Sequence, residues 1–170
     1  MKTVLRWLSI LPALLFPFVI FGFSAQTGPE SGSLSYGLSQ IILASANHLF
    51  SLELTGREIN SYAMSLHILI RKIAHVLEYF VLSFCVFLPL KVWFFNPNAQ
   101  NPRKELVQKT IIPSYLICIC YAAADEWLQS IIPGRNGTPI DVLIDSIGIT
   151  LGCAVLVICY FHTKSFCNKQ

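Results

Sequence analysis

Four apolar segments, each long enough to cross a lipid bilayer, constrain the fold of this chain more than any other feature. A transmembrane helix needs about 20 predominantly apolar residues, and the segments cover residues 4–23, 66–90, 111–128 and 140–161. Charged residues make up only 12% of the 170 residues, whereas a typical soluble domain has about 25%. We therefore expect an all-α integral membrane protein in which residues 1–170 form one four-transmembrane-helix bundle.

The first apolar segment has the basic start of a signal peptide but not its cleavage site. Phe23 stands two residues before Ala25, where signal cleavage requires a small side chain. We therefore expect the segment to be retained as the first membrane helix, kinked at Pro12 and Pro17.

Two polar stretches separate the first three segments. From the end of "SAQTGPESGSLSYGLSQ" onward, apolar residues recur at helical spacing, including Leu38, Ile41, Ile42, Leu49 and Leu52. This pattern predicts an amphipathic helix between spans one and two, at the membrane surface or over the bundle. The second stretch, "NPNAQNPRKELVQK", predicts a solvated basic loop between spans two and three.

The distribution of lysine and arginine predicts the orientation of the bundle. Four spans place both termini on one side, and that side carries about twice as many basic residues as the other, an asymmetry typical of cytoplasmic flanks. We therefore expect a multi-pass protein of the cell membrane with cytoplasmic N- and C-termini. These flanks account for the formal net charge of +3, and the four spans exclude a soluble nucleic-acid-binding function.

The first of three polar motifs, "RKIAHVLEY", lies in the second segment. It contains Arg71, Lys72, His75, Glu78 and Tyr79. The histidine, glutamate and tyrosine follow the arginine by 4, 7 and 8 residues. This spacing brings most of the motif onto one face of a helix.

The second motif, "DEWLQSIIPGR", ends the third segment. Asp125 and Gln129 share a helix face, whereas Glu126 points about 100° away from Asp125. We therefore expect one carboxylate to face the polar cluster and the other to face water or headgroups. The following Pro-Gly pair ends the helix and is expected to present Arg135 at the outer surface.

The third motif opens the fourth segment. Asp141 and Asp145 are four residues apart, and Gly148 and Gly152 extend the same stripe, which allows a neighbouring helix to approach closely. Thr138, followed by proline, is typical of a helix start.

The three motifs place five carboxyl groups and only three fixed positive charges in or beside membrane helices. An ionised side chain at the centre of a membrane helix costs about 2.5–3.5 kcal/mol on insertion scales. We therefore expect these groups to face inward together at the outer end of the bundle. The missing positive charge predicts protonated carboxyls, a charged His75, a bound cation or entry of solvent.

Together with "FGFSAQTGPESGSLS", these motifs resemble the VanZ-like family of bacterial membrane proteins, named for a protein linked to teicoplanin resistance. The resemblance covers most of the chain from Phe21 to Gly152 and includes the pair Ser24 and Gln26. It implies a contribution to glycopeptide resistance or envelope adaptation, with membrane lipids and a lipid-linked or cell-wall precursor as partners. Leu128 stands where the family frequently has histidine, so a mechanism that needs two histidines does not fit.

Two hypotheses about function remain open. In the first, the cluster forms an outward-opening, water-filled site that binds or modifies a lipid or wall precursor. Its candidate catalytic residues are His75, Glu78, Asp125, Asp141 and Asp145, and its candidate substrate-binding residues are Arg71, Lys72, Tyr79, Glu126, Gln129 and Arg135. In the second, the protein is a non-enzymatic scaffold or small transporter whose dry, fully paired ion network holds the helices together. No established metal-ligand spacing occurs, so a metal or another cofactor stays undetermined.

Overall fold

The computed structural model describes residues 2–167, and this part of the chain contains helices and no strand. The elements are α1 (Lys2–Leu8), α2 (Leu11–Ser24), α3 (Gly28–Phe50), α4 (Gly56–Phe94), α5 (Pro102–Leu106), the π-helical turn η1 (Val107–Ile111), α6 (Ile112–Ile131) and α7 (Pro139–Cys167). Among the described residues, four helical segments are long and apolar enough to cross a membrane: Thr3–Ser24, Gly56–Phe94, Pro102–Ile131 and Pro139–His162. The prediction of an all-α bundle with four spans is confirmed.

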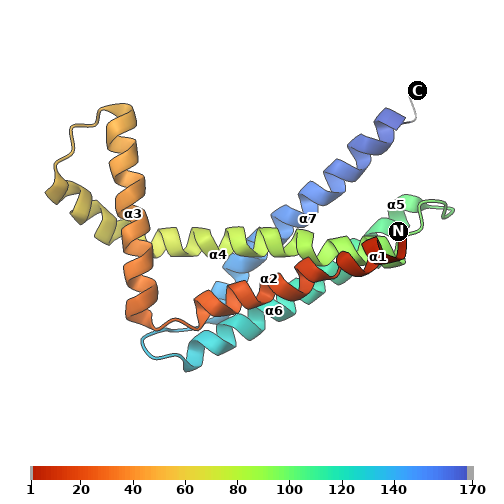
Figure 1. The fold of residues 1–170 in the computed structure, drawn as a ribbon, viewed down its shortest axis with the longest axis horizontal. Helices are drawn as coiled ribbons and strands as arrows, with labels where there is room; N and C mark the ends of the chain where they lie inside the picture. Colours follow the sequence, from red (N-terminus) through yellow and green to blue (C-terminus); the bar gives the residue numbers. More distant parts are fainter. Residues whose placement is uncertain (1, 168–170) are drawn as a thin grey trace.

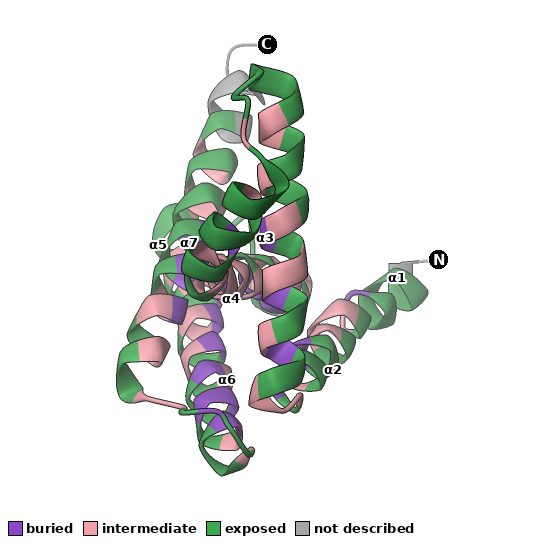
Figure 2. Cartoon of the chain, turned by 90° about the vertical axis from the view of Figure 1, so that its left-hand side faces the viewer, coloured by how far each residue is buried: buried purple, intermediate pink, exposed green. Residues whose placement is uncertain are grey.

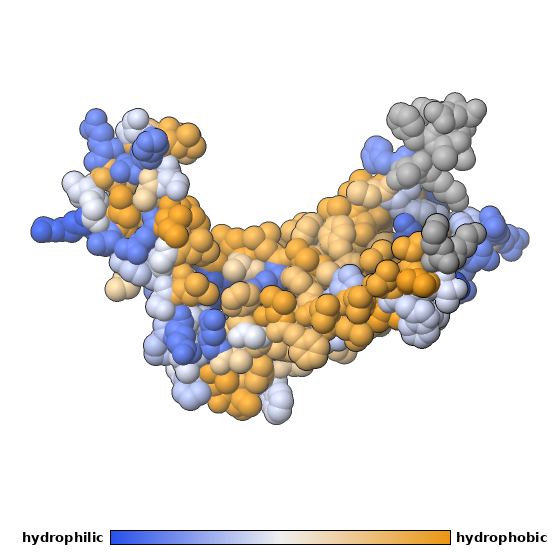
Figure 3. All heavy atoms as spheres, in the orientation of Figure 1, coloured by the Kyte–Doolittle hydropathy of each residue, from blue (hydrophilic) through white to orange (hydrophobic). Residues whose placement is uncertain are grey.

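Three of the spans lie along one another, the fourth crosses them, and the connections lie at two opposite ends (Figure 1). Helices α2 and α6 run beside α4, and α7 crosses α4. The loop before α5 and the carboxyl end of α7 lie at the end where α1 begins, whereas α3 and the connection between α6 and α7 lie at the other. Large apolar side chains cover the middle of the molecule and hydrophilic ones gather toward both ends (Figure 3). This surface fits lipid contact along the spans.

The first span is two helices rather than one helix kinked at both prolines. The break between α1 and α2 falls at Ser9 and Ile10, just before Pro12 in the first turn of α2. Proline fits this position because the first helical N–H groups have no intrahelical acceptor. Helix α2 then continues through Pro17 to Ser24.

The predicted amphipathic helix is α3, which stands across the end of the bundle and packs on α4 (Figure 1). Its buried face consists of Ser31, Ser35 and Ser39, whereas apolar residues such as Leu34 and Ile41 are exposed. The Ser35 and Ser39 hydroxyls donate to carbonyl oxygens one turn earlier, so these small side chains present little unpaired polarity to α4. The apolar side chains of α3 are thus largely exposed, and two of them, Leu34 and Leu38, border a groove between α3 and α4.

The predicted solvated loop between spans two and three is too long. Helical structure resumes at Pro102, after Asn101 accepts a hydrogen bond from the backbone N–H of Lys104. The Lys109 ammonium pairs with the Glu105 carboxylate at 2.6 Å, one helical turn earlier. Local capping and this ion pair therefore extend the third span at its amino end.

The core lies where α4, α6 and α7 meet and includes Tyr79, Leu82, Cys118, Ala122 and Ile149. The glycine stripe of α7 faces α4, as predicted from its spacing. A Cβ atom at Gly148 would overlap the carbonyl oxygen of Val76, and one at Gly152 would overlap the Ser83 hydroxyl. The backbones of α4 and α7 are therefore in direct contact one residue from His75.

Candidate functional site

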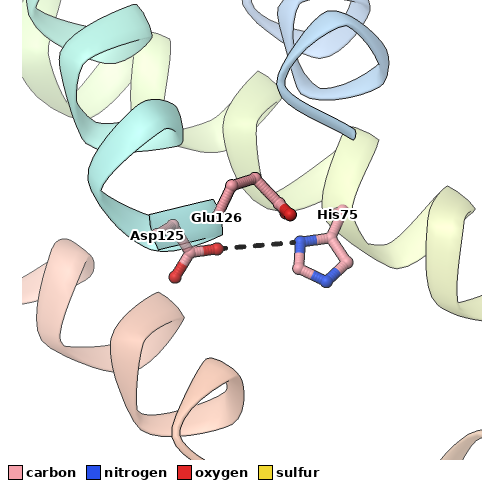
Figure 4. Close-up of side chains that lie close together, drawn as sticks. All are labelled: His75, Asp125 and Glu126. Atoms are coloured by element: carbon pink, nitrogen blue, oxygen red, sulfur yellow. Dashed lines mark ion pairs between the residues drawn. The ribbon is translucent and has the colours of Figure 1, made fainter. Parts of the chain in front are cut away.

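The polar motifs meet at the end of the bundle that α3 crosses. His75 comes from α4, Asp125 and Glu126 come from α6, and Asp145 comes from α7. Figure 4 shows the two α6 carboxyl groups directed toward the His75 ring. Figure 2 shows buried residues on α6 and α3 at this end. The structure thus brings together groups that lie 70 residues apart in the chain.

Three carboxylates surround one nitrogen of His75. The Nδ1 atom lies 3.8 Å from Glu78 Oε2, 4.0 Å from Asp125 Oδ2 and 3.9 Å from Asp145 Oδ1. These distances are too long for direct hydrogen bonds, and Nδ1 is buried without a hydrogen-bond partner in the described residues. The histidine is held close to the carboxylates without being bonded to any of them.

The expectation that only one of the two adjacent α6 carboxylates faces the cluster is wrong. Asp125 is 0% exposed and Glu126 is 5% exposed. The two side chains leave the helix in different directions. Helices α2 and α4 cover Asp125, and the segment before α7 covers Glu126. Both carboxylates therefore belong to the site.

The amide of Gln129 connects these carboxylates to the first span. Its Nε2 lies 3.1 Å from Asp125 Oδ2, 3.2 Å from Glu126 Oε1 and 3.2 Å from the Ser24 hydroxyl. An amide nitrogen carries only two hydrogens, so these three acceptors share two donors. Gln129 thus holds both α6 carboxylates, and its contact with Ser24 ties them to the end of α2; both residues belong to the motifs described above.

Thr138 connects Glu126 with the start of α7. Its backbone N–H donates to Glu126 Oε2 at 3.1 Å, and its hydroxyl donates to Asp141 Oδ2 at 2.7 Å. The other Asp141 oxygen pairs with the Lys72 ammonium at 3.3 Å. Lys72 and Asp141 are thereby engaged with each other at the half-exposed rim of the site.

Arg135 is buried rather than presented at the surface. It is only 9% exposed, and its Nη2 donates to the Phe23 carbonyl oxygen at 3.2 Å. Gly134, with a φ of 75°, turns the chain inward, and the Gly28 N–H holds the turn by donating to Pro133. This left-handed conformation favours glycine. Contacts with α2 and α3 keep the arginine buried. The turn sequence alone does not specify these long-range contacts.

The Arg135 guanidinium is incompletely paired. Its Nε and Nη1 are buried without a hydrogen-bond partner among the described residues, as is Nε of Arg71. Burial, and after it the positive charge of Arg71, lower the pKa of Arg135 below its ordinary value. Two guanidinium groups are therefore close enough to repel each other.

Two cavities meet at these arginines. The first, about 260 Å³, is strongly charged and is lined by Lys72, Glu126, Asp141 and Asp145 among others. The second, about 190 Å³, extends between α3 and α4 along Leu34, Leu38 and Ile70. Both are also lined by Arg71, His75 and Arg135. A charged chamber and an apolar groove thus share one wall.

Sequence reasoning missed the α3 side of this groove. The signal was present as serines at every fourth position, Ser31, Ser35 and Ser39, which is a small-residue stripe for close helix packing. It was obscured by the more prominent leucine and isoleucine pattern on the exposed face. Tyr79, in contrast, was predicted at the site and is fully buried, with its hydroxyl unpartnered within the described residues.

Three residues of the cluster could hold a metal ion. His75, Asp125 and Glu126 each offer one ligand atom, and these atoms lie within 4.8 Å of one another. Imidazole nitrogen and carboxylate oxygen are ligands of several divalent metals in proteins.

The fold and site define a multi-pass α-helical membrane protein with a buried ionic cluster at one end of its bundle. Residues 9–160, most of the chain, match the model of the VanZ/LLP1 family, and the chain belongs to this family. Comparisons with curated proteins and with solved structures returned no match. The family membership that the three motifs indicated is confirmed.

Proposed function

We propose that this protein binds the phosphate-bearing headgroup of a membrane lipid or lipid-linked wall precursor. The carrying observation is the pair Arg71 and Arg135: both residues line the charged chamber and the apolar groove, and each has a guanidinium nitrogen without a hydrogen-bond partner among the described residues. Guanidinium groups bind phosphate through paired hydrogen bonds, and an anion between them would relieve their mutual repulsion. An amphiphile would place its headgroup at the arginines and the start of its chain along Leu34 and Leu38.

The pairing of the cluster supports a binding site over a purely structural network. A scaffold would need its buried charges paired, because an unpaired buried charge is strongly destabilising. Among the described residues, Lys72 with Asp141 is the one ion pair that joins a lysine or arginine to a carboxylate of the cluster. Polar atoms of Arg71, His75, Arg135 and Asp145 lack a partner among the described residues, and a ligand could supply one.

Orientation and cellular role extend this proposal. The basic flanks favour cytoplasmic termini in the cell membrane, and in that orientation the cluster would lie toward the outer face. There it would meet lipid-linked wall precursors of a bacterial envelope. A contribution to teicoplanin resistance or to envelope adaptation then follows from headgroup binding, with His75, Glu78 and Asp125 available for proton transfer.

Binding of undecaprenyl phosphate to the purified full chain in lipid nanodiscs tests the proposal, with undecaprenol as the ligand that lacks phosphate. Arg135→Lys and Arg71→Gln each remove paired hydrogen bonding and should weaken binding about tenfold or more, since a charged hydrogen bond contributes about 1.5–3 kcal/mol. Arg57→Gln, at an exposed arginine of α4 outside both cavities, is the matched control and should bind normally. Equal binding of the phosphate and the alcohol, or no effect of either arginine, would refute headgroup recognition.

A susceptibility assay addresses the cellular role. His75→Ala, Glu78→Gln, Asp125→Asn and Arg135→Lys should each abolish any teicoplanin tolerance conferred by the wild-type protein while membrane abundance stays normal. Loss of tolerance only in proportion to lost abundance would instead favour the structural network.

A further inference from the structure

The buried cluster contains more carboxyl groups than positive side chains, and its geometry indicates a bound cation. Its carboxyl groups belong to Glu78, Asp125, Glu126, Asp141 and Asp145, whereas its fixed cations are Arg71, Lys72 and Arg135. If all are ionised and His75 is neutral, two positive charges are missing. Buried charges in proteins are paired or coordinate metals.

We propose that His75, Asp125 and Glu126 bind a divalent transition-metal cation such as Mn²⁺ or Zn²⁺. Metal bonds to imidazole nitrogen and carboxylate oxygen are about 2.0–2.2 Å long, so two ligands of one ion lie at most about 4.4 Å apart. The separation of 4.0 Å between His75 Nδ1 and Asp125 Oδ2 falls within this limit. It is too long for a hydrogen bond but suits two ligands on one cation.

Unpartnered atoms at the same place provide an independent indication of a ligand. Asp145 is only 1% exposed, its Oδ1 lies 3.9 Å from Nδ1 of His75, and its Oδ2 is buried without a hydrogen-bond partner among the described residues. Nδ1 of His75 is also buried and unpartnered. The Asp125 and Glu126 carboxyl groups point toward this nitrogen (Figure 4). A cation at this nitrogen, within reach of the facing Asp145 oxygen, would give the buried Nδ1 of His75 the partner that no described residue supplies.

The surrounding hydrogen bonds fit a metal centre. Gln129 donates to Asp125 and Glu126, and the Thr138 N–H donates to the other Glu126 oxygen. Residues that orient metal ligands in this way tune affinity in known metal sites. Asp145 Oδ1 and Glu78 Oε2, at 3.9 and 3.8 Å from His75 Nδ1, stand where they could complete the coordination. A bound cation would also offset the repulsion between these carboxylates and an incoming phosphate.

Binding of Mn²⁺ to the full chain tests the site without any phosphate ligand. The protein is treated with EDTA, returned to chelator-free nanodiscs of phosphatidylcholine, and titrated with Mn²⁺ while free Mn²⁺ is followed by electron paramagnetic resonance. We expect one site per chain, competed by Zn²⁺, with affinity lowered about tenfold or more in His75→Ala and Asp125→Asn, an effect at least as large as that of residues supporting metal ligands. Asp125→Asn keeps the side-chain volume, so the bundle should still fold.

Matched variants decide the interpretation. His67→Ala, on the same helix outside the cluster, and Glu105→Gln, at the opposite end of the bundle, should bind Mn²⁺ like the wild type. If Asp125→Asn fails to accumulate, Glu126→Gln takes its place with the same expected loss. Absence of Mn²⁺ binding up to millimolar concentration, or unchanged binding in the cluster variants, would overturn the cation site. Neither outcome would affect arginine-dependent headgroup binding measured in EDTA, so the two proposals can fail separately.

Discussion

Gly148 of α7 lies against the carbonyl oxygen of Val76 in α4, so closely that a Cβ atom at position 148 would overlap it. Val76 follows His75, and Asp145 precedes Gly148 by one helical turn. This backbone contact therefore sets the separation of 3.9 Å between the His75 ring and the Asp145 carboxylate. A glycine without any polar chemistry thus allows the α4 and α7 members of the ionic cluster to approach each other.

Gly148→Ala should separate α4 from α7 and destabilise the bundle by about 1–3 kcal/mol, the usual cost of overpacking. Denaturant unfolding of the purified protein in detergent measures this change. Gly37→Ala is the matched control, because a Cβ at this position in α3 meets nothing within 4 Å. It should be neutral or stabilising by up to about 1 kcal/mol, since alanine is the better helix former. Equal effects of both substitutions would contradict the proposed close contact.

Gln129→Leu should destabilise the protein by about 1–3 kcal/mol, because it leaves buried acceptors of Asp125 and Glu126 without their donor. The change in the midpoint of unfolding in detergent provides the measurement. Gln108→Leu makes the same substitution at an exposed position of the same helical segment and should have little effect. A destabilisation shared by both variants would mean that leucine itself, rather than loss of the amide, is responsible.

Glu30 makes the start of α3 sensitive to acid. Its carboxylate accepts hydrogen bonds from the hydroxyl and backbone N–H of Thr27, and these bonds lower the pKa of Glu30 from its ordinary value of 4.5. The contribution of these hydrogen bonds to folding stability is therefore complete above pH 4.5. It is lost as pH falls through the lowered pKa of Glu30 in the folded state. Glu30→Gln should reduce thermal stability near neutral pH and have no effect in strong acid. In a Thr27→Ala background, which removes the hydroxyl but keeps the backbone N–H, the difference near neutral pH should shrink; an undiminished difference would exclude the hydroxyl bond as its cause.

The orientation of the bundle can be measured by cysteine labelling in intact cells. In a variant without the six native cysteines, Asn136→Cys should react with a membrane-impermeant maleimide, whereas Asn98→Cys should react only after permeabilisation. Both positions are exposed and lie in connections at opposite ends of the bundle. Labelling with the reverse preference would place the termini outside and the cluster at the cytoplasmic face.

The number of spans, the end of α6 near the Pro-Gly pair and the start of α7 after Thr138 were predictable from the sequence. Hydrophobic length and turn chemistry are local properties, so they can be read without knowing which segments meet. Helical spacing likewise predicted that Arg71, His75, Glu78 and Asp145 face inward. The family motifs added Ser24 and Gln129, which the structure joins by a hydrogen bond.

Only the tertiary structure decided how these groups are arranged. The burial of both Asp125 and Glu126 requires cover from α2, α4 and the segment before α7, and the inward turn of Arg135 requires the ends of α2 and α3. The pairing of Lys72 with Asp141, rather than with another carboxylate, depends on where α7 crosses α4. Such contacts join residues far apart in the chain, and the energy of each depends on packing that no local pattern encodes.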